Sequence, residues 1–186
     1  MSQPQRIRVL YDEAAIAARN AEMAATIAAE AGADLLVVAV LKGSFMFVAD
    51  LIRAMHRAGM SPQVEFVHLS SYRAATVSSG QVEILRDVQS DVRGRHVLLV
   101  DDILESGRTL AFAKDLLAAR GAARVSTAVL LEKPGKRAVN IKADYVGFEC
   151  PDYFVVGYGM DVAHSFRQLP YVGVVETADQ AGLPGI

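Results

Sequence analysis

Three apolar runs, separated by stretches with helical spacing of apolar residues, constrain the fold of this chain more than any other feature. The runs occupy residues 34–41, 96–100 and 124–131 and read DLLVVAVL, HVLLV and RVSTAVLL. A run that is apolar on both faces is typical of a strand covered on both sides, as in a parallel sheet. With helical patterns over residues 44–59 and 109–119 between them, the runs predict an α/β fold with a central, mostly parallel sheet flanked by helices.

The neighbouring segments extend this pattern. Residues 12–31 are rich in Ala, Glu, Arg and Met and predict a helix that Asp12 caps. Residues 64–72 predict a further strand and residues 81–85 a short one, whereas the small, polar stretch 73–80 predicts a loop.

The last third of the chain differs in its amino-acid composition. Three short segments, YVGFE, YFVVGYG and YVGVVE, are rich in Tyr, Phe, Val and Gly. They predict a small irregular β-rich hood lobe packed over the edge of the main sheet. A length of 186 residues suits one domain, which we expect to span residues 1–186. We expect its core at about residues 10–140 and the hood mainly at 141–186, to which part of the N-terminus can belong.

Composition excludes several classes of protein. The formal net charge of −2, from 19 basic and 21 acidic residues, argues against nucleic acid as a partner. The single cysteine, Cys150, excludes a disulfide framework and a multi-cysteine zinc site, and we expect an inert, packed thiol. The start of the chain lacks the apolar core of a secretory signal, and the run 35–41 is far shorter than the roughly 20 residues of a membrane helix. We therefore expect a soluble, cytoplasmic protein with no membrane partner.

Polar residues follow each of the three apolar runs. They are Lys42, Gly43 and Ser44 after the first run, Asp101 and Asp102 after the second, and Glu132 and Lys133 after the third. Ligands of open parallel sheets bind beyond the carboxyl ends of the strands. We therefore expect all three clusters on one rim of the sheet.

The segment VLLVDDILESGRTL, residues 97–110, carries the most chemical information. Free amides at a helix start, with hydroxyls and a glycine that allows close approach, form an anion site. The turn supplies these groups and a cation through Ser106, Gly107, Arg108 and Thr109. A phosphate suits this turn, and the two acids before it suit hydroxyl groups or a metal ion. Ribose 5-phosphate offers both kinds of group, whereas a Walker loop and a dinucleotide fingerprint are absent from the sequence.

This segment resembles the ribosyl-phosphate signature of the type I phosphoribosyltransferases. Further segments narrow the resemblance to the hypoxanthine-guanine phosphoribosyltransferases: LKGSFMF (41–47), SSY (70–72), LLEKPGKR (130–137) and PDYFVVGYGMDVAHSFRQLPYVGVV (151–175). They occur in the order of that family, and the resemblance covers roughly residues 35–176.

The resemblance implies a type I phosphoribosyltransferase fold and a purine salvage enzyme. Such an enzyme transfers the phosphoribosyl group of 5-phosphoribosyl 1-pyrophosphate to hypoxanthine or guanine, giving IMP or GMP and pyrophosphate, with Mg²⁺ as cofactor. It also implies a homodimer or homotetramer, to which the apolar helix at residues 45–55 can supply an interface.

The family's residue roles carry over to matching positions. Asp101 and Asp102 are expected to hold the ribose hydroxyls and help position Mg²⁺, while the loop 105–109 wraps the 5′-phosphate. Expected pyrophosphate contacts are Lys42, Gly43 and Arg167, with a cis peptide between Leu41 and Lys42. Expected purine contacts are Lys133, Phe154, Val155 and Asp161, of which Asp161 is also expected to ligate Mg²⁺. Ser71 and Tyr72 are expected to begin a loop that covers the site.

Glu105 departs from the family pattern, in which many members have Asp. The acid at this position is usually assigned as the base near purine N7, and Glu keeps the carboxylate but extends its reach by roughly 1.5 Å. Our hypothesis is that Glu105 still serves as this base.

Other interpretations of single residues remain open at this point. Asp101 and Asp102 can cap the turn that follows them. Lys42 and Lys133 can be solvated surface charges, and Phe154 and Val155 can be core residues. The four histidines, His56, His68, His96 and His164, have no ligand spacing, so we expect no metal role for them.

Three alternatives to the salvage enzyme also remain. One is a xanthine-preferring purine phosphoribosyltransferase, and another is a non-catalytic regulator on the same fold that senses phosphoribosyl pyrophosphate. The third is a phosphoacceptor receiver domain, which also places paired acids at a strand end.

Overall fold

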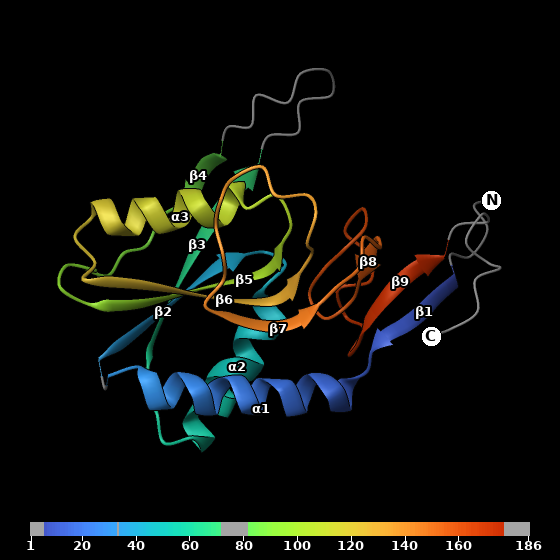
Figure 1. Cartoon of the computed structure of the whole chain (residues 1–186), viewed down its shortest axis with the longest axis horizontal. Helices are drawn as coiled ribbons and strands as arrows, with labels where there is room; N and C mark the ends of the chain where they lie inside the picture. The colour runs from blue at the N-terminus through green and yellow to red at the C-terminus, as the bar shows by residue number, and fades with distance from the viewer. Residues whose placement is uncertain (1–5, 33, 72–81, 177–186) are drawn as a thin grey trace.

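The computed structural model describes residues 6–32, 34–71 and 82–176, which form two sheets and three helices (Figure 1). The larger sheet contains β2 (Leu35–Leu41), β3 (Gln63–Ser71), β4 (Val82–Arg86), β5 (His96–Leu104), β6 (Arg124–Glu132) and β7 (Tyr145–Glu149). The smaller sheet contains β1 (Arg6–Tyr11), β8 (Val155–Val156) and β9 (Val172–Glu176). The helices are α1 (Glu13–Glu30), α2 (Phe45–Arg57) and α3 (Arg108–Ala119).

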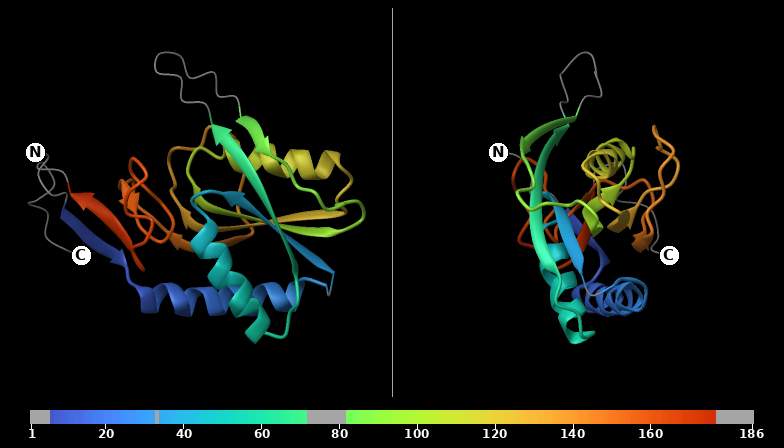
Figure 2. Two further views of the ribbon diagram at one scale, coloured as in Figure 1. Left: turned by 180° about the vertical axis from the view of Figure 1, so that it is seen from behind. Right: turned by 90° about the vertical axis from the view of Figure 1, so that its left-hand side faces the viewer.

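The larger sheet has the strand order β4-β3-β2-β5-β6-β7. All neighbouring pairs are parallel except β3 and β4, which pair antiparallel at one edge. Helices α1 and α2 lie on one face of this sheet and α3 lies on the other (Figures 1 and 2). The predicted α/β fold with a mostly parallel, helix-flanked sheet is therefore confirmed.

Strand β2 shows why a run without polar residues forms the centre of this sheet. Its odd-numbered residues, such as Val37, pack in the core under α1 and α2, and its even-numbered residues, such as Val38, pack in the core under α3. Both of these valines are 0% exposed. Because successive side chains of a strand point to opposite faces, a strand between two helical layers needs apolar residues at every position.

The helix ends also follow the sequence. The side chain of Asp12 accepts a hydrogen bond of 2.8 Å from the amide of Ala15, as expected of the cap of α1. None of the helices among the described residues is long and apolar enough to cross a membrane.

The smaller sheet has the order β1-β9-β8 and is antiparallel throughout. It forms a lobe beside the larger sheet (Figure 1), and β1 pairs with β9 in it. The boundary at about residue 140 stays a prediction.

Two segments of the last third differ from the sequence prediction. Residues 145–149, expected in the small lobe, form the parallel edge strand β7 of the larger sheet. Gly147 permits this pairing, because a Cβ there would lie 2.4 Å from the carbonyl oxygen of Leu130. The segment YFVVGYG forms only the two-residue strand β8, because the backbone turns at Gly157 and Gly159, whose φ angles are 92° and 97°.

Candidate active site

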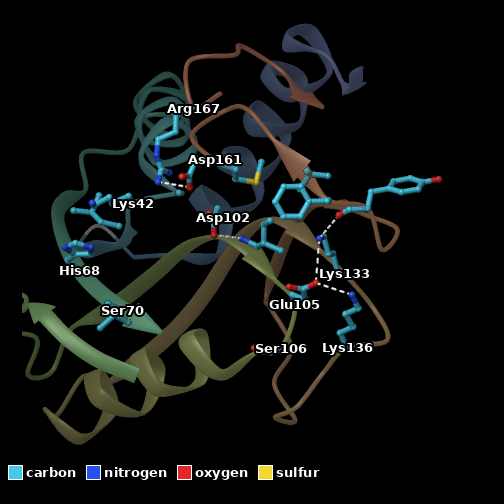
Figure 3. Close-up of a pocket in the computed structure, with 18 of the residues that line it drawn as sticks. Lys42, His68, Ser70, Asp102, Glu105, Ser106, Lys133, Lys136, Asp161 and Arg167 are labelled. Atoms are coloured by element: carbon cyan, nitrogen blue, oxygen red, sulfur yellow. Dashed lines mark hydrogen bonds and ion pairs between the residues drawn. The ribbon is translucent and has the colours of Figure 1, made fainter. Parts of the chain in front are cut away.

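A cavity of about 1150 Å³ lies at the carboxyl ends of β2, β5 and β6, between the larger sheet and the loops of the small lobe (Figure 3). Its lining includes residues from each of these three strand ends, as the sequence predicted for one common rim. The predicted residues that line it are Lys42, Gly43, Asp102, Glu105, Ser106, Lys133, Phe154, Val155, Asp161 and Arg167.

The end of β2 approaches the end of β5 very closely. A Cβ built at Gly43 would lie 1.6 Å from Oδ2 of Asp102, so only glycine fits between the two strand ends. The peptide bond between Leu41 and Lys42 is cis, as the family resemblance led us to expect. Gly43 thus lies directly beside the Asp102 carboxylate, and the preceding residue, Lys42, is exposed.

The two acids after β5 occupy different environments. Asp102 lines the cavity, whereas Asp101 is 7% exposed and is not among the lining residues. Burial raises the pKa of Asp101 well above its ordinary value, and the charge of Asp102 adds to this effect. Burial also raises the pKa of Asp102, and hydrogen bonds to its carboxylate, followed by the nearby charge of Arg167, offset part of this effect. Asp102 is therefore the acid that faces a ligand in this cavity.

The turn after β5 leads directly into α3. Glu105 and Ser106 line the cavity, but Gly107, Arg108 and Thr109 do not. Gly107 is the N-cap of α3 with a φ of 81°, and a Cβ there would lie 2.6 Å from Cγ2 of Ile141. Glycine is thus required for both the left-handed backbone and the close packing that begins this helix.

Two lysines converge on Glu105 at one end of the cavity (Figure 3). The Nζ atoms of Lys133 and Lys136 lie 3.7 Å and 3.9 Å from Oε1 of Glu105. Lys133 donates a 2.7 Å hydrogen bond to the carbonyl oxygen of Tyr153, and Lys136 pairs with Asp152 at 2.6 Å. The Lys133 side chain is only 8% exposed, so the interpretation as a solvated surface charge is wrong.

Arg167 and Asp161 form a second polar group at the other end, near Lys42 (Figure 3). Nη2 of Arg167 lies 2.7 Å from Oδ1 of Asp161, and its Nη1 donates a 2.6 Å hydrogen bond to the carbonyl oxygen of Gly159. The amide of His164 donates to Oδ2 of Asp161 at 2.7 Å. The cavity therefore has cations at both ends and a carboxylate between them.

Phe154 adds an apolar surface to this polar cavity. Its side chain is 57% exposed although it is aromatic, so it is not a core residue. Val155 lines the cavity but is 6% exposed, and Val156 is fully buried. An exposed aromatic ring in a cavity offers a flat face on which a planar ligand can stack.

Some predicted features lie at the limit of the described residues. Ser71 ends β3, and Tyr72 and the predicted loop 73–80 lie outside the described residues.

Within the described parts of the chain, no three His, Cys, Asp or Glu side chains gather as a metal cage. Cys150 is buried, and burial raises the pKa of its thiol, consistent with an inert side chain.

The sequence did not single out several lining residues. They are His68 and Ser70 on β3, Lys136 after β6, and Asp152 before Phe154. Lys136 and Asp152 both lie within segments that carry the family resemblance, and that was the available signal. Ser70 also lies within such a segment, SSY (70–72), whereas His68 has no motif around it and is recognised only from its pairing with Leu41 at the end of β2.

Comparison with known proteins gives one consistent result. The pattern of the family described as "Phosphoribosyl transferase domain" matches residues 8–163. Hypoxanthine phosphoribosyltransferase of Escherichia coli K12 is 41% identical over 94% of this chain and 98% of its own length. Hypoxanthine-guanine phosphoribosyltransferase of Streptococcus agalactiae is 42% identical over 91% of this chain and 93% of its own. The crystal structure of a hypoxanthine phosphoribosyltransferase from Staphylococcus aureus superposes with a TM-score of 0.85, at 38% identity over 91% of each chain.

Proposed function

The chain belongs to the phosphoribosyl transferase domain family and, within it, to the hypoxanthine-guanine phosphoribosyltransferases, and on this basis we propose how its cavity carries out the transfer. It has the type I phosphoribosyltransferase fold and is a purine salvage enzyme. The reaction transfers the phosphoribosyl group of 5-phosphoribosyl 1-pyrophosphate to a purine base and releases pyrophosphate. The observation that carries the mechanism is the arrangement of this one cavity, with cations at both ends and Asp102 between them.

Lys42, Gly43 and Arg167 bind the leaving pyrophosphate in this proposal. Breaking the bond at the anomeric carbon leaves negative charge on pyrophosphate and positive charge on the ribose. Fixed cations that meet the developing negative charge stabilise the transition state. The position of Lys42 and Arg167 at the same end of the cavity supports this role.

The ribose and its 5′-phosphate occupy the middle of the cavity. Asp102 binds the ribose hydroxyls and faces the cationic sugar. The more buried Asp101 stabilises the position of Asp102, because its carboxylate accepts a 2.9 Å hydrogen bond from the Asp102 amide. The 5′-phosphate binds at the turn 105–109, through the Ser106 hydroxyl and the amides at the start of α3. Arg108 and Thr109 contribute through that helix start, since free amides at a helix N-terminus attract anions.

The purine binds at the end of the cavity that contains Glu105. Phe154 stacks on the base, Val155 offers backbone groups to its edge, and Lys133 donates to the 6-oxo oxygen. The ammonium group of Lys133 has three protons, so it can keep its hydrogen bond to Tyr153 while it donates to the base. Glu105 accepts the proton at N7 in this proposal, and its Oε1 lies 3.7 Å and 3.9 Å from the Nζ atoms of Lys133 and Lys136.

The acidic groups of the cavity fit a magnesium ion that arrives with its substrate. Mg²⁺ usually uses one or two carboxylates together with substrate phosphates rather than an all-protein cage. Asp102 and Asp161 line the cavity, and a carboxylate has about four lone-pair sites, so the contacts of Asp161 leave sites for a metal. We propose that Asp161 ligates Mg²⁺ and that Asp102 helps position it through water, while Asp101, which does not line the cavity, contributes through its contact with Asp102. When bound, Mg²⁺ would neutralise charge on the pyrophosphate.

Location and assembly are also proposals. A pyrophosphorylated sugar does not cross a bilayer unaided, which supports a cytoplasmic enzyme. A homodimer or homotetramer is supported by apolar surface at the start of α2, where Phe45 is 36% exposed, and on β3, where Phe66 is 40% exposed. Ser71 and Tyr72 would begin the loop that covers the bound substrates.

Turnover of the purified protein tests this function. Incubation with 5-phosphoribosyl 1-pyrophosphate, Mg²⁺ and hypoxanthine should give IMP and pyrophosphate in equal amounts, and guanine should give GMP. Removal of Mg²⁺ with EDTA should abolish the reaction, and added Mg²⁺ should restore it. A higher kcat/KM for xanthine would favour the xanthine-preferring alternative, and substrate binding without turnover would favour a regulator.

A further inference from the structure

A chain of polar side chains, buried at Asn20 and Tyr158 and partly exposed at Asp50, connects the two helices under the sheet with the loop that follows β8. Nδ2 of Asn20, in α1, donates a 3.0 Å hydrogen bond to the hydroxyl of Tyr158. That hydroxyl donates a 2.5 Å hydrogen bond to Oδ2 of Asp50, in α2. Tyr158 is 6% exposed and Asn20 is 3% exposed. Burial and the hydrogen bond to Asp50 raise the pKa of Tyr158, so its hydroxyl remains a donor at neutral pH.

The backbone at Tyr158 forms a turn that needs such an anchor. Gly157, Tyr158 and Gly159 have φ angles of 92°, 49° and 97°, so three successive residues lie in the left-handed region. Gly157 and Met160 exchange backbone hydrogen bonds of 3.0 Å across the turn. A residue with a side chain is uncommon in this region and is retained when its surroundings fix it. Tyr158 is held at two points: its amide donates a 2.8 Å hydrogen bond to the carbonyl oxygen of Leu169, and its hydroxyl is held between the two helices.

The same turn contacts the end of the cavity at which we place the pyrophosphate. The carbonyl oxygen of Gly159 accepts the 2.6 Å hydrogen bond from Arg167, and the Gly159 amide donates to the Arg167 carbonyl at 3.0 Å. A Cβ at Gly159 would lie 2.3 Å from the carbonyl oxygen of Gly43. The turn is therefore packed between Arg167 and the segment that contains Lys42, and a shift of the turn moves both.

From these contacts we propose that Tyr158 is a positioning residue for the pyrophosphate end of the active site. Its hydroxyl fixes the turn 157–160 against α1 and α2, and this turn then fixes Arg167 relative to Lys42 and Gly43. Tyr158 itself does not touch the substrate. The inference rests on the proposed function, since it assigns a purpose to groups that bind pyrophosphate in that proposal.

Tyr158→Phe tests the role of the hydroxyl alone, because it keeps the ring and its packing. We expect kcat/KM for 5-phosphoribosyl 1-pyrophosphate to fall about tenfold and the Kd for inorganic pyrophosphate with Mg²⁺ to rise by a similar factor. The Kd for GMP, which has no pyrophosphate group, should stay within twofold of the wild-type value. A general loss of structure would weaken both ligands together.

Tyr145→Phe is the matched control. Tyr145 is 7% exposed, and its hydroxyl also joins a helix to the core by donating a 2.7 Å hydrogen bond to Oε2 of Glu30. It lies in β7, and its hydroxyl bonds Glu30 rather than the turn 157–160, so this variant should lower the Tm without changing the Kd for pyrophosphate. If Tyr158→Phe does not fold, Asp50→Ala removes the acceptor, keeps the tyrosine and is expected to have the same effect on pyrophosphate.

The outcomes distinguish a failure of this inference from a failure of the proposed function. Wild-type turnover, with equal pyrophosphate binding by the wild type and Tyr158→Phe, overturns the positioning role alone. Weaker pyrophosphate binding in Tyr145→Phe as well overturns it in favour of a general loss of stability. A wild-type protein that neither turns over nor binds pyrophosphate overturns the proposed function and this inference together.

Discussion

At the scale of single residues, the space between Gly43 and Asp102 leaves no room for a side chain at position 43. A Cβ at Gly43 would lie 1.6 Å from Oδ2 of Asp102, whereas a Cβ at Gly32 would meet nothing within 4 Å. Gly43→Ala must therefore displace the acid that we assign to the ribose, and a displacement of about 1 Å can reduce the rate about 100-fold. We expect kcat/KM to fall by at least that factor in a variant that still folds. Gly32→Ala is the control, and equal rates for the two variants would contradict our account.

Glu105 is the second residue with a testable role. Replacement by Gln keeps its size and removes its charge and basicity. A positioned base contributes about 10²–10⁴-fold to the rate, so we expect Glu105→Gln to lower kcat by a factor in this range. Steady-state kinetics with saturating substrates measures the change. Full turnover in the variant would exclude Glu105 as the base.

Phe154 should affect binding without affecting stability. Base stacking on an aromatic side chain is worth about 1–3 kcal/mol, so Phe154→Ala should raise the KM for hypoxanthine roughly 5- to 150-fold. Its ring is 57% exposed, and we therefore expect little change in Tm. Phe66→Ala removes another exposed ring that does not line the cavity and should leave this KM unchanged. An unchanged KM in Phe154→Ala would show that the purine binds elsewhere.

The sequence predicted half of the residues that line the cavity, but not their different environments. Asp101 and Asp102 are identical neighbours in the sequence, and only the register of β5 between β2 and β6 decides which carboxylate faces the cavity. The ion pair of Lys136 with Asp152 joins two loops that are distant in sequence. Such a contact depends on where the loops meet, which no local pattern specifies.

At the scale of helices and strands, local pattern was sufficient for elements buried on both faces. Strands β2, β5 and β6 are long enough and apolar enough to be recognised without their partners. Strand β7 has only five residues, with exposed or half-buried positions among them, and such a segment fits either sheet. Its assignment to the larger sheet depends on pairing with β6, which is a property of the folded chain.

An ion pair between two elements gives a pH-dependent prediction. Arg120, at the C-terminal end of α3, donates hydrogen bonds to both carboxylate oxygens of Asp87, which follows β4. These bonds hold the pKa of Asp87 below its ordinary value. A lowered pKa in the folded state adds stability that is present above the unfolded pKa of about 3.9 and is lost as the pH falls through the lower folded value.

We therefore expect Asp87→Asn to lower the free energy of unfolding at pH 7 by about 0.5–1 kcal/mol, since the pair is partly exposed. The difference from the wild type should shrink below about pH 4. Urea unfolding at pH 7 and at pH 3 measures it. A difference that is equal at the two pH values would show that the charge of Asp87 does not act in this way.

At the scale of the whole molecule, the active site exists because the two sheets meet. Strand ends of the larger sheet supply Lys42, Asp102 and Lys133, and the loops around the small sheet supply Phe154 and Arg167. The sequence predicted a common rim from the parallel strands alone. It did not predict how the small lobe would close over that rim, because the turn at Tyr158 and the pairing of β1 with β9 are long-range contacts.

The most direct test of this account is a crystal structure of the protein with GMP. We predict that the 5′-phosphate lies on the turn 105–109, the ribose hydroxyls face Asp102, and guanine stacks on Phe154. An empty cavity in crystals grown with saturating GMP, or a nucleotide bound at another surface, would contradict the claim that this cavity is the phosphoribosyl transfer site.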